Sequence, residues 1–168
     1  MEFTVGKKTL ENAMTNIVSV APAKAIKPIL SSVLIECSDA VYLYATDMET
    51  SIRVKLEGAS AQSPGKTAVD AKTLFEIAKN APSAQLNIKQ ENEATLDVYS
   101  NGVVANIPML DPEDFPALIF DSTAEPIELI PTLSSEIDRV IYAIAADPMM
   151  RALNGLHFES VDGHLRFV

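Results

Sequence analysis

The sequence predicts an α+β fold assembled from repeated βαβββ units. Three observations support this prediction: strand-like runs alternate with helical apolar stripes, Pro, Gly and Asn separate them, and the same order of elements returns after about 60 residues. The 168 residues are 48% apolar and 21% charged, which is typical of a folded globular chain. We expect two domains, residues 1–120 with two complete units and residues 121–168 with one incomplete unit.

The first unit begins with a short strand at residues 2–5 and continues into a helix. Apolar residues of this helix recur at i, i+3, i+4, i+7 and i+8, which predicts one buried stripe (Leu10, Ala13, Met14, Ile17 and Val18). Ala-Pro-Ala at 21–23 ends the helix. Three strands are expected to follow, at 29–36, 41–45 and 51–56.

The second unit starts after a break at residues 62–65. A strand is expected at 67–69, and Asp70 is a good N-cap for a helix with apolar residues Leu74, Phe75, Ile77 and Ala78. Three strands follow at 85–89, 94–99 and 103–109, and Asn101-Gly102 is typical of a tight hairpin turn. Each unit is expected to form a four-stranded sheet covered by its helix, and two such sheets are expected to join edge to edge.

A linker-like segment at residues 111–116 precedes the third unit. Its expected elements are a strand at 126–130, a helix at about 133–146, and strands at 153–160 and 164–168. Ser135 and Asp138 resemble a capping box, and the expected buried stripe consists of Leu133, Ile137, Val140, Ile141 and Ile144. Residues 153–168 align with residues 30–45 without a gap, which favours duplication and leaves this unit short of its last strand.

The charge balance restricts the possible functions. Thirteen Lys and Arg residues against 23 Asp and Glu residues give a net charge of −10, which disfavours a generally basic nucleic-acid binder but permits a local basic patch. The single cysteine, Cys37, excludes a disulfide framework and a Cys-rich zinc site. No apolar run reaches the ~18 residues of a membrane span, and the first fifteen residues are unlike a signal peptide, so we expect a cytoplasmic protein without a membrane partner.

Residues for catalysis are poorly represented. The sequence has neither a Gly-rich phosphate loop nor a nucleophile elbow, and we predict a non-enzyme without cofactor or metal. His157 and His164 lie on neighbouring expected strands and would approach each other, which keeps an α+β enzyme open as a third hypothesis. Asp47 and Glu49 have the spacing of one strand face, where a pair of carboxylates can bind a cation but more often has a structural role or faces solvent.

Several short motifs resemble the bacterial DNA polymerase III beta subunit family, the sliding clamps. Lys-Pro-Ile-Leu at 27–30 followed by Ala-Thr-Asp-Met-Glu at 45–49 resembles the first clamp domain, and Asp-Phe-Pro at 114–116 resembles the segment before the interdomain linker. Leu-Asn-Gly at 153–155 resembles the first long strand of domain two. The resemblance runs from Met1 to Val168 in consistent order, and it implies helices that line a central hole with sheets outside.

The same resemblance implies a function in DNA replication. Family members have three such domains, of which this chain would hold one and about half of the next. Two chains close head to tail, as a homodimer ring around double-stranded DNA, and confer processivity on the replicative DNA polymerase; partners include the clamp loader. A ring retains DNA topologically, so weak phosphate contacts suffice. The alternative is a stand-alone clamp-domain module that binds or caps a full clamp.

Candidate DNA contacts are lysines of the helices and of the loop after the first helix. No acidic residue lies between Glu11 and Glu36, and Lys24 and Lys27 fall in this interval. Lys24 also matches a basic residue on a DNA-touching loop of the family. The remaining candidates are Lys7, Lys72 and Lys79, with Lys8 and Arg139. Acidic residues share these helices, so ordinary solvated helix faces explain each lysine equally well.

Two further sets of candidates follow from the resemblance alone. Ring closure pairs domain one with domain three of the other subunit, and the matching positions here are Thr73, Ile77, Ala105 and Ile107. Leu153 matches a wall position of the hydrophobic pocket that takes peptides of polymerases and the clamp loader, although core packing accounts for Leu153 equally well. The family's arginine lies two residues further from Leu-Asn-Gly than Arg151 does, so no DNA role is assigned to Arg151.

Overall fold

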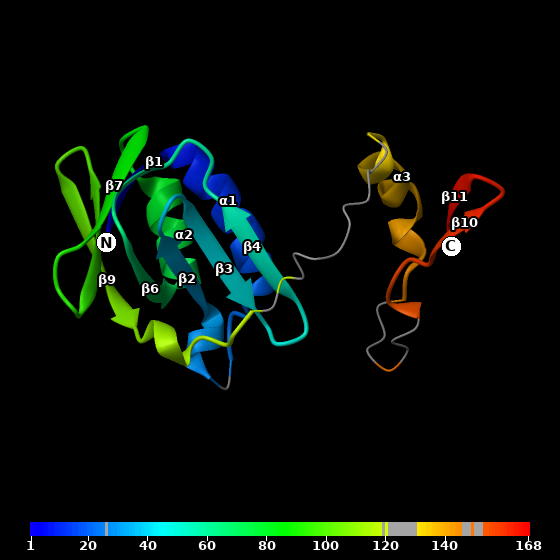
Figure 1. The fold of residues 1–168 in the computed structure, drawn as a ribbon, viewed down its shortest axis with the longest axis horizontal. Coiled ribbons are helices and arrows are strands. Elements are labelled where there is room, and N and C mark those ends of the chain that lie inside the picture. The colour runs from blue at the N-terminus through cyan, green and yellow to red at the C-terminus, as the bar shows by residue number, and fades with distance from the viewer. Residues whose placement is uncertain (26, 119, 121–130, 146–148, 150–152) are drawn as a thin grey trace. The chain divides into compact units, whose positions relative to one another are not determined.

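The computed structural model describes residues 1–25, 27–118, 120, 131–145, 149 and 153–168. The chain divides into two compact units, Met1–Ile119 and Phe120–Val168 (Figure 1). The strand expected at 126–130, residue 146 of the expected third helix, and Arg151 lie outside the described residues.

The described residues of the N-terminal unit form two helices and one antiparallel sheet. The helices are α1 (Lys7–Val20) and α2 (Ala71–Asn80). The strands are β1 (Glu2–Gly6), β2 (Ser32–Cys37), β3 (Val41–Thr46), β4 (Ser51–Lys55), β5 (Ser60–Ser63), β6 (Gly65–Asp70), β7 (Gln85–Gln90), β8 (Thr95–Ser100) and β9 (Val103–Leu110). Their order in the sheet is β4-β3-β2-β6-β9-β8-β7-β1-β5. The predicted α+β class is confirmed.

The two repeats exchange their first strands. β1 begins the first repeat but pairs with β7 of the second, and β6 begins the second repeat but pairs with β2 of the first. The expectation that each unit forms its own four-stranded sheet is therefore wrong. Because β6 also pairs with β9, at Val69↔Met109, the two halves join into one continuous sheet.

In the N-terminal unit, the half of the sheet formed by β4, β3, β2 and β6 has an inner face and an outer face. One cross-strand row, in contact with the helix side, consists of Thr67, Ile35, Leu43 and Val54. The next row, on the opposite face, consists of Lys66, Glu36, Tyr42 and Lys55. Leu10, Met14 and Ile17 of α1 and Leu74 of α2 share the main core with the inner row. The exposed faces of both helices therefore point away from the sheet (Figure 1).

The segment at residues 111–116 is part of the N-terminal unit, so its prediction as a linker is wrong. The Asp111 carboxylate accepts a hydrogen bond from the Glu113 N–H at 2.9 Å and begins a 3-10 helix, Pro112–Asp114. Phe115 then packs against Ile29 and Leu34 in a second, smaller core on the outer face. The same core explains why the strand expected to begin at residue 29 instead begins at Ser32, after a 3-10 helix, Pro28–Ser31.

Local sequence signals account for other boundaries. Asp70 caps α2, because its carboxylate accepts a hydrogen bond from the Thr73 N–H at 2.7 Å, as predicted. Asn101 and Gly102 both have positive φ, +47° and +79°, and close the predicted β8–β9 hairpin. The sequence prediction missed β5, whose polar residues pair only with β1.

The described residues of the C-terminal unit form α3 (Leu133–Val140), a 3-10 helix (Ile141–Ala143) and the hairpin of β10 (Phe158–Val161) and β11 (His164–Phe167). The predicted capping box is wrong, because the Ser135 hydroxyl donates to the Thr132 carbonyl at 2.7 Å instead of accepting from the backbone. The predicted buried stripe is at most half-buried, and Ile141 is 45% exposed, because one helix and a hairpin provide little cover. No helix among the described residues is long and apolar enough to span a membrane.

The two hairpins that were aligned without a gap differ by one residue in their turns. Cys37 pairs with Val41 across a three-residue turn, whereas Val161 pairs with His164 across the two-residue turn Asp162-Gly163. A shift of one residue exchanges the faces of a strand. The ungapped alignment of residues 153–168 with residues 30–45 is therefore wrong beyond the turn, although the order of strands is the same.

Candidate nucleic-acid interface

The helix side of the N-terminal unit is positively charged within an acidic chain. Residues 7–27 and 70–80, which comprise α1, its following loop, and α2 with its cap, contain six lysines and three acidic residues. Their net charge is +3, whereas the whole chain carries −10. A local positive layer of this kind attracts phosphate groups even when the total charge is negative.

Two of the predicted DNA contacts, Lys24 and Lys27, are exposed in the loop between α1 and β2. Lys24 lines a cavity of about 570 Å³ together with Asp70 and Thr73 at the N-terminus of α2. This cavity brings the loop of the first repeat next to the second helix. Lys24 therefore belongs to the same surface as α2, which the sequence order alone does not show.

The lysines of the two helices differ in their surroundings. Lys72 and Lys79 are exposed on α2, and the Lys79 ammonium lies 6.0 Å from the centroid of the Phe75 ring. Lys7 is different, because its Nζ donates a hydrogen bond of 2.7 Å to the Ala81 carbonyl oxygen just beyond α2. The ammonium of Lys7 thus connects the start of α1 to the end of α2, and its role as a DNA contact stays a prediction. In the C-terminal unit, Arg139 pairs with Glu136 at 3.1 Å.

The predicted dimer edge is a partly unpaired strand. Within the described residues, β9 pairs with β8 from Val103 to Pro108, but with β6 only at Met109 and Leu110. The backbone of residues 103–107 consequently presents unpaired N–H and C=O groups on its other side.

The side chains predicted for this edge point mainly inward. Thr73 is exposed, whereas Ile77 and Ala105 are half-buried and pack against the main core. Ile107 is 0% exposed, so its prediction as an interface side chain is wrong: alternation along β9 turns it into the core. Val104, 47% exposed, was missed because the resemblance, and not exposure, selected the candidates.

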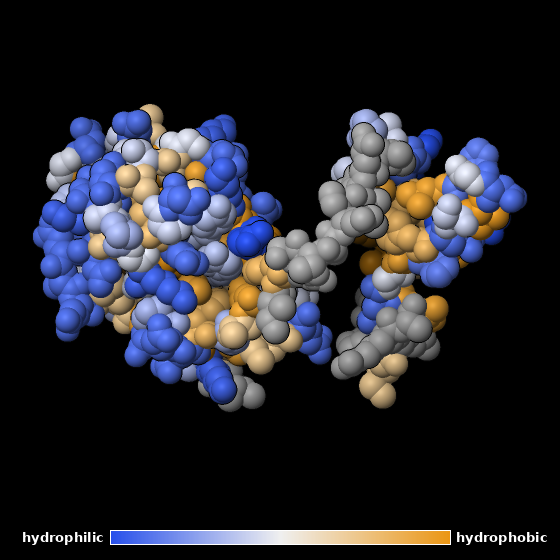
Figure 2. Space-filling model, in the orientation of Figure 1, coloured by the Kyte–Doolittle hydropathy of each residue, from blue (hydrophilic) through white to orange (hydrophobic). Residues whose placement is uncertain are grey.

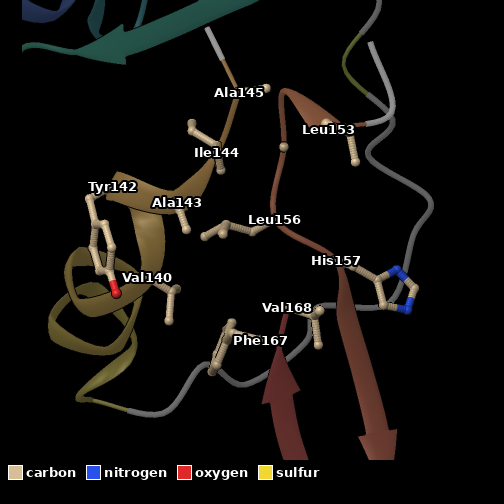
Figure 3. Close-up of a pocket in the computed structure, with 11 residues that line it drawn as sticks. Val140, Tyr142, Ala143, Ile144, Ala145, Leu153, Leu156, His157, Phe167 and Val168 are labelled. Atoms are coloured by element: carbon tan, nitrogen blue, oxygen red, sulfur yellow. The ribbon is translucent and has the colours of Figure 1, made fainter. Parts of the chain in front are cut away.

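Leu153 lies on an apolar surface of the C-terminal unit. It is 58% exposed and lines a cavity of about 460 Å³ together with Leu156 and Phe167 (Figure 3). Hydrophobic residues are prominent on this unit in Figure 2, and none of its described residues is buried. Leu153 is therefore not a core residue of the described structure.

The described residues bring no group of metal-binding side chains together. His157 pairs with Val168 and His164 with Val161, so the two imidazoles lie at opposite ends of the hairpin, about 13 Å apart along the strand. The expectation that they approach each other is wrong. No three His, Cys, Asp or Glu side chains gather as a metal site in the part of the chain that the structure describes. Cys37 is buried, and burial raises the pKa of its thiol.

Asp47 and Glu49 do not share a strand face, because they lie in the turn between β3 and β4. The Asp47 carboxylate accepts hydrogen bonds from the N–H groups of Thr50 (2.6 Å) and Glu49 (2.9 Å), which lower its pKa. These bonds hold Met48 at φ +79° in the same turn. Asp47 thus has a structural role in this turn, as the sequence favoured over a cation site.

Comparison with known proteins places these features in a family. The family described as DNA polymerase III beta subunit, N-terminal domain, matches residues 1–119. The beta sliding clamps of Chlamydia pneumoniae and Escherichia coli K12 are 26% and 27% identical to the chain, over 97% and 100% of its residues. These matches cover 45% and 46% of the relatives, so the chain spans about half of their length.

A solved structure also supports the fold. The DNA polymerase III beta subunit of Thermotoga maritima matches 99% of this chain and 46% of its own, with 26% identity and a TM-score of 0.86. The family resemblance and the fold class that it implied are both confirmed.

Proposed function

Because this chain belongs to the DNA polymerase III beta subunit family, we propose that it acts as part of a DNA sliding clamp. In this function a ring encircles duplex DNA and confers processivity on the replicative DNA polymerase without catalysing a reaction. The N-terminal unit corresponds to the first clamp domain, and residues 120–168 to the first part of the second. The protein works in the cytoplasm, with double-stranded DNA, the polymerase and the clamp loader as partners.

The observation that carries this proposal is the local positive charge on the helix side of the N-terminal unit. The helix side has a net charge of +3 in a chain of −10, and Lys24, Lys27, Lys72 and Lys79 are exposed there. A tight, charge-driven binder needs a basic total, but a ring that retains DNA by its topology does not. Weak phosphate contacts also allow movement along the duplex, because no contact depends on the base sequence.

The remaining interfaces are part of the same proposal. The unpaired edge of β9, with Thr73 and Val104 beside the half-buried Ile77 and Ala105, is the surface that closes a homodimer ring. Leu153 belongs to the pocket that takes partner peptides, which its 58% exposure and apolar neighbours support.

Binding of short duplex DNA by this chain tests the proposal. At low salt we expect weak binding that does not depend on sequence and falls steeply with added salt. Cross-linking from a photoreactive duplex backbone is expected at α1, α2 and the Lys24 loop. Cross-links confined to the outer row of the sheet, at Lys66 and Lys55, would contradict it.

A further inference from the structure

The exposed face of α1 carries one column of hydrogen-bond donors. Lys8, Asn12 and Asn16 follow one another at i, i+4 and i+8, and all three are exposed. Side chains four residues apart lie above one another on a helix. The column is about 12 Å long, which corresponds to the rise of about three to four base pairs.

The amides of this column are free, whereas the neighbouring hydroxyls are not. Thr15 Oγ1 donates to the Glu11 carbonyl at 2.9 Å, and Ser19 Oγ donates to the Asn16 carbonyl at 2.7 Å. In the part of the chain that the structure describes, neither Asn12 nor Asn16 makes a hydrogen bond through its amide side chain. An amide has two N–H donors, and phosphate oxygens only accept. Among the exposed residues of α1, the side-chain donors left for a phosphate backbone are therefore those of the column.

The equivalent column on α2 is less suited to phosphate. It consists of Lys72, Glu76 and Asn80 at the same spacing. Asn80 Nδ2 already donates to the Glu76 carbonyl at 2.8 Å and lies 3.4 Å from a carboxylate oxygen of Glu76. The Glu76 carboxylate repels phosphate, so Lys72 is the one favourable group of this column. The two repeats share a fold but differ in this surface.

We propose that Lys8, Asn12 and Asn16 form the phosphate-contact line of α1. This inference rests on the proposed function, which turns the helix side toward duplex DNA. Neutral amides bind phosphate without releasing counterions, so their contribution to affinity is independent of salt, in contrast to that of Lys8. A line of one charge and two amides holds the duplex in register with α1 and limits the electrostatic attraction that would slow sliding.

Nuclear magnetic resonance of the full 168-residue chain tests the assignment directly. The protein is titrated with a short duplex at low salt, and the side-chain amides of Asn12 and Asn16 are followed together with the backbone amides of the Lys24 loop. The amide of Gln62, which donates to Thr4 Oγ1 at 3.0 Å in the sheet, is the reference. We expect shifts at Asn12, Asn16 and the loop, and none at Gln62.

Other results separate the two proposals. Shifts in the Lys24 loop without shifts at Asn12 and Asn16 overturn the contact line and leave the proposed function intact. Absence of shifts on the whole helix side overturns the proposed function as well. Shifts at Gln62 alone place DNA on the sheet and overturn both.

Paired variants measure the energetic role of the amides. The double variant Asn12→Ala/Asn16→Ala is expected to bind the duplex about three- to tenfold more weakly, with an unchanged salt dependence. The matched control Thr15→Ala/Ser19→Ala removes two hydroxyls whose protons are already used, and affinity is expected to stay the same. Ala favours helix more than Asn does, so lost folding does not explain weaker binding.

Lys8→Gln completes the comparison. It is expected to weaken binding and to reduce the slope of log affinity against log salt by about 0.9. Equal losses in the asparagine variant and in its hydroxyl control, or a reduced salt slope in the asparagine variant, would overturn the proposed role of the amides.

Discussion

Lys7 Nζ donates a hydrogen bond of 2.7 Å to the carbonyl oxygen of Ala81, a residue 74 positions further along the chain. The carbonyl groups at a helix C-terminus carry a partial negative charge and have no partner within the helix. The lysine therefore stabilises the end of α2, and its hydrogen bond connects the first repeat to the second. Its backbone N–H strengthens this connection by donating to the Ala84 carbonyl at 2.9 Å.

Replacement of this lysine is expected to affect stability more than DNA binding. Lys7→Met keeps the aliphatic stem but leaves the Ala81 carbonyl without its donor, which is expected to lower the free energy of unfolding by about 1–2 kcal/mol. Urea unfolding followed by circular dichroism measures the change. Lys8→Met is the matched control, because it removes the same charge from the next, exposed residue. Equal stabilities of the two variants would contradict the structural role of Lys7.

Gly65 is expected to tolerate no side chain. A Cβ at this position would lie 2.6 Å from Met1 Cβ and 3.2 Å from Met1 Cα, so the first residue of the chain would have to move. Gly65→Ala is expected to lower the free energy of unfolding by about 1–3 kcal/mol. In the control Gly6→Ala, the new Cβ meets only Thr9 Oγ1, at 3.5 Å. A melting temperature for Gly65→Ala as high as that of the control would refute the close contact.

Tyr44 is expected to lose its phenolic proton only at unusually high pH. Burial, followed by the hydrogen bond and charge of Glu36, raises the pKa of Tyr44 from 10.0 to about 12. The folded state therefore holds the phenolic proton more tightly than the unfolded state, so this contribution to stability is complete below pH 10 and is lost between about pH 10 and 12. Glu36→Gln is expected to lower the pKa of Tyr44, as followed by ultraviolet absorbance of the phenolate.

The matched control for this titration is Glu57→Gln. Glu57 is exposed and pairs with Lys55 at 3.5 Å. It is not among the groups that raise the pKa of Tyr44. If both variants titrate like the parent protein, Glu36 does not contribute to the raised pKa.

Much of the fold was predictable because its signals are local. The N-cap Asp70, the turn Asn101-Gly102 and the stripe of α1 each depend on residues within a few positions of one another. The exchange of β1 and β6 was not predictable in this way, since hydrophobic alternation identifies a strand but not its partner. β5 gave no signal, because it is short and polar and is held by its pairing with β1.

The candidate site was predictable only in part, for the same reason. The exposure of Lys24, Lys72 and Lys79 agrees with a charged helix side, but the hydrogen bond that engages Lys7 comes from a residue far away in sequence. Ile107 was chosen by resemblance, although strand alternation with Ala105 places both on the inner face. Charge alone also favoured lysines over Asn12 and Asn16, whose free amides become apparent only from their neighbours' hydrogen bonds.

The central claim, that the helix side and not the sheet side meets DNA, is tested most directly by two variants of equal charge. Lys24→Glu/Lys72→Glu reverses two charges on the helix side, and Lys55→Glu/Lys66→Glu reverses two in the outer row of the sheet. Both change the net charge from −10 to −14. Affinity for a short duplex at low salt is expected to fall more than about tenfold in the first variant and to change little in the second. Equal losses in both variants, or a larger loss in the sheet variant, would contradict the claim.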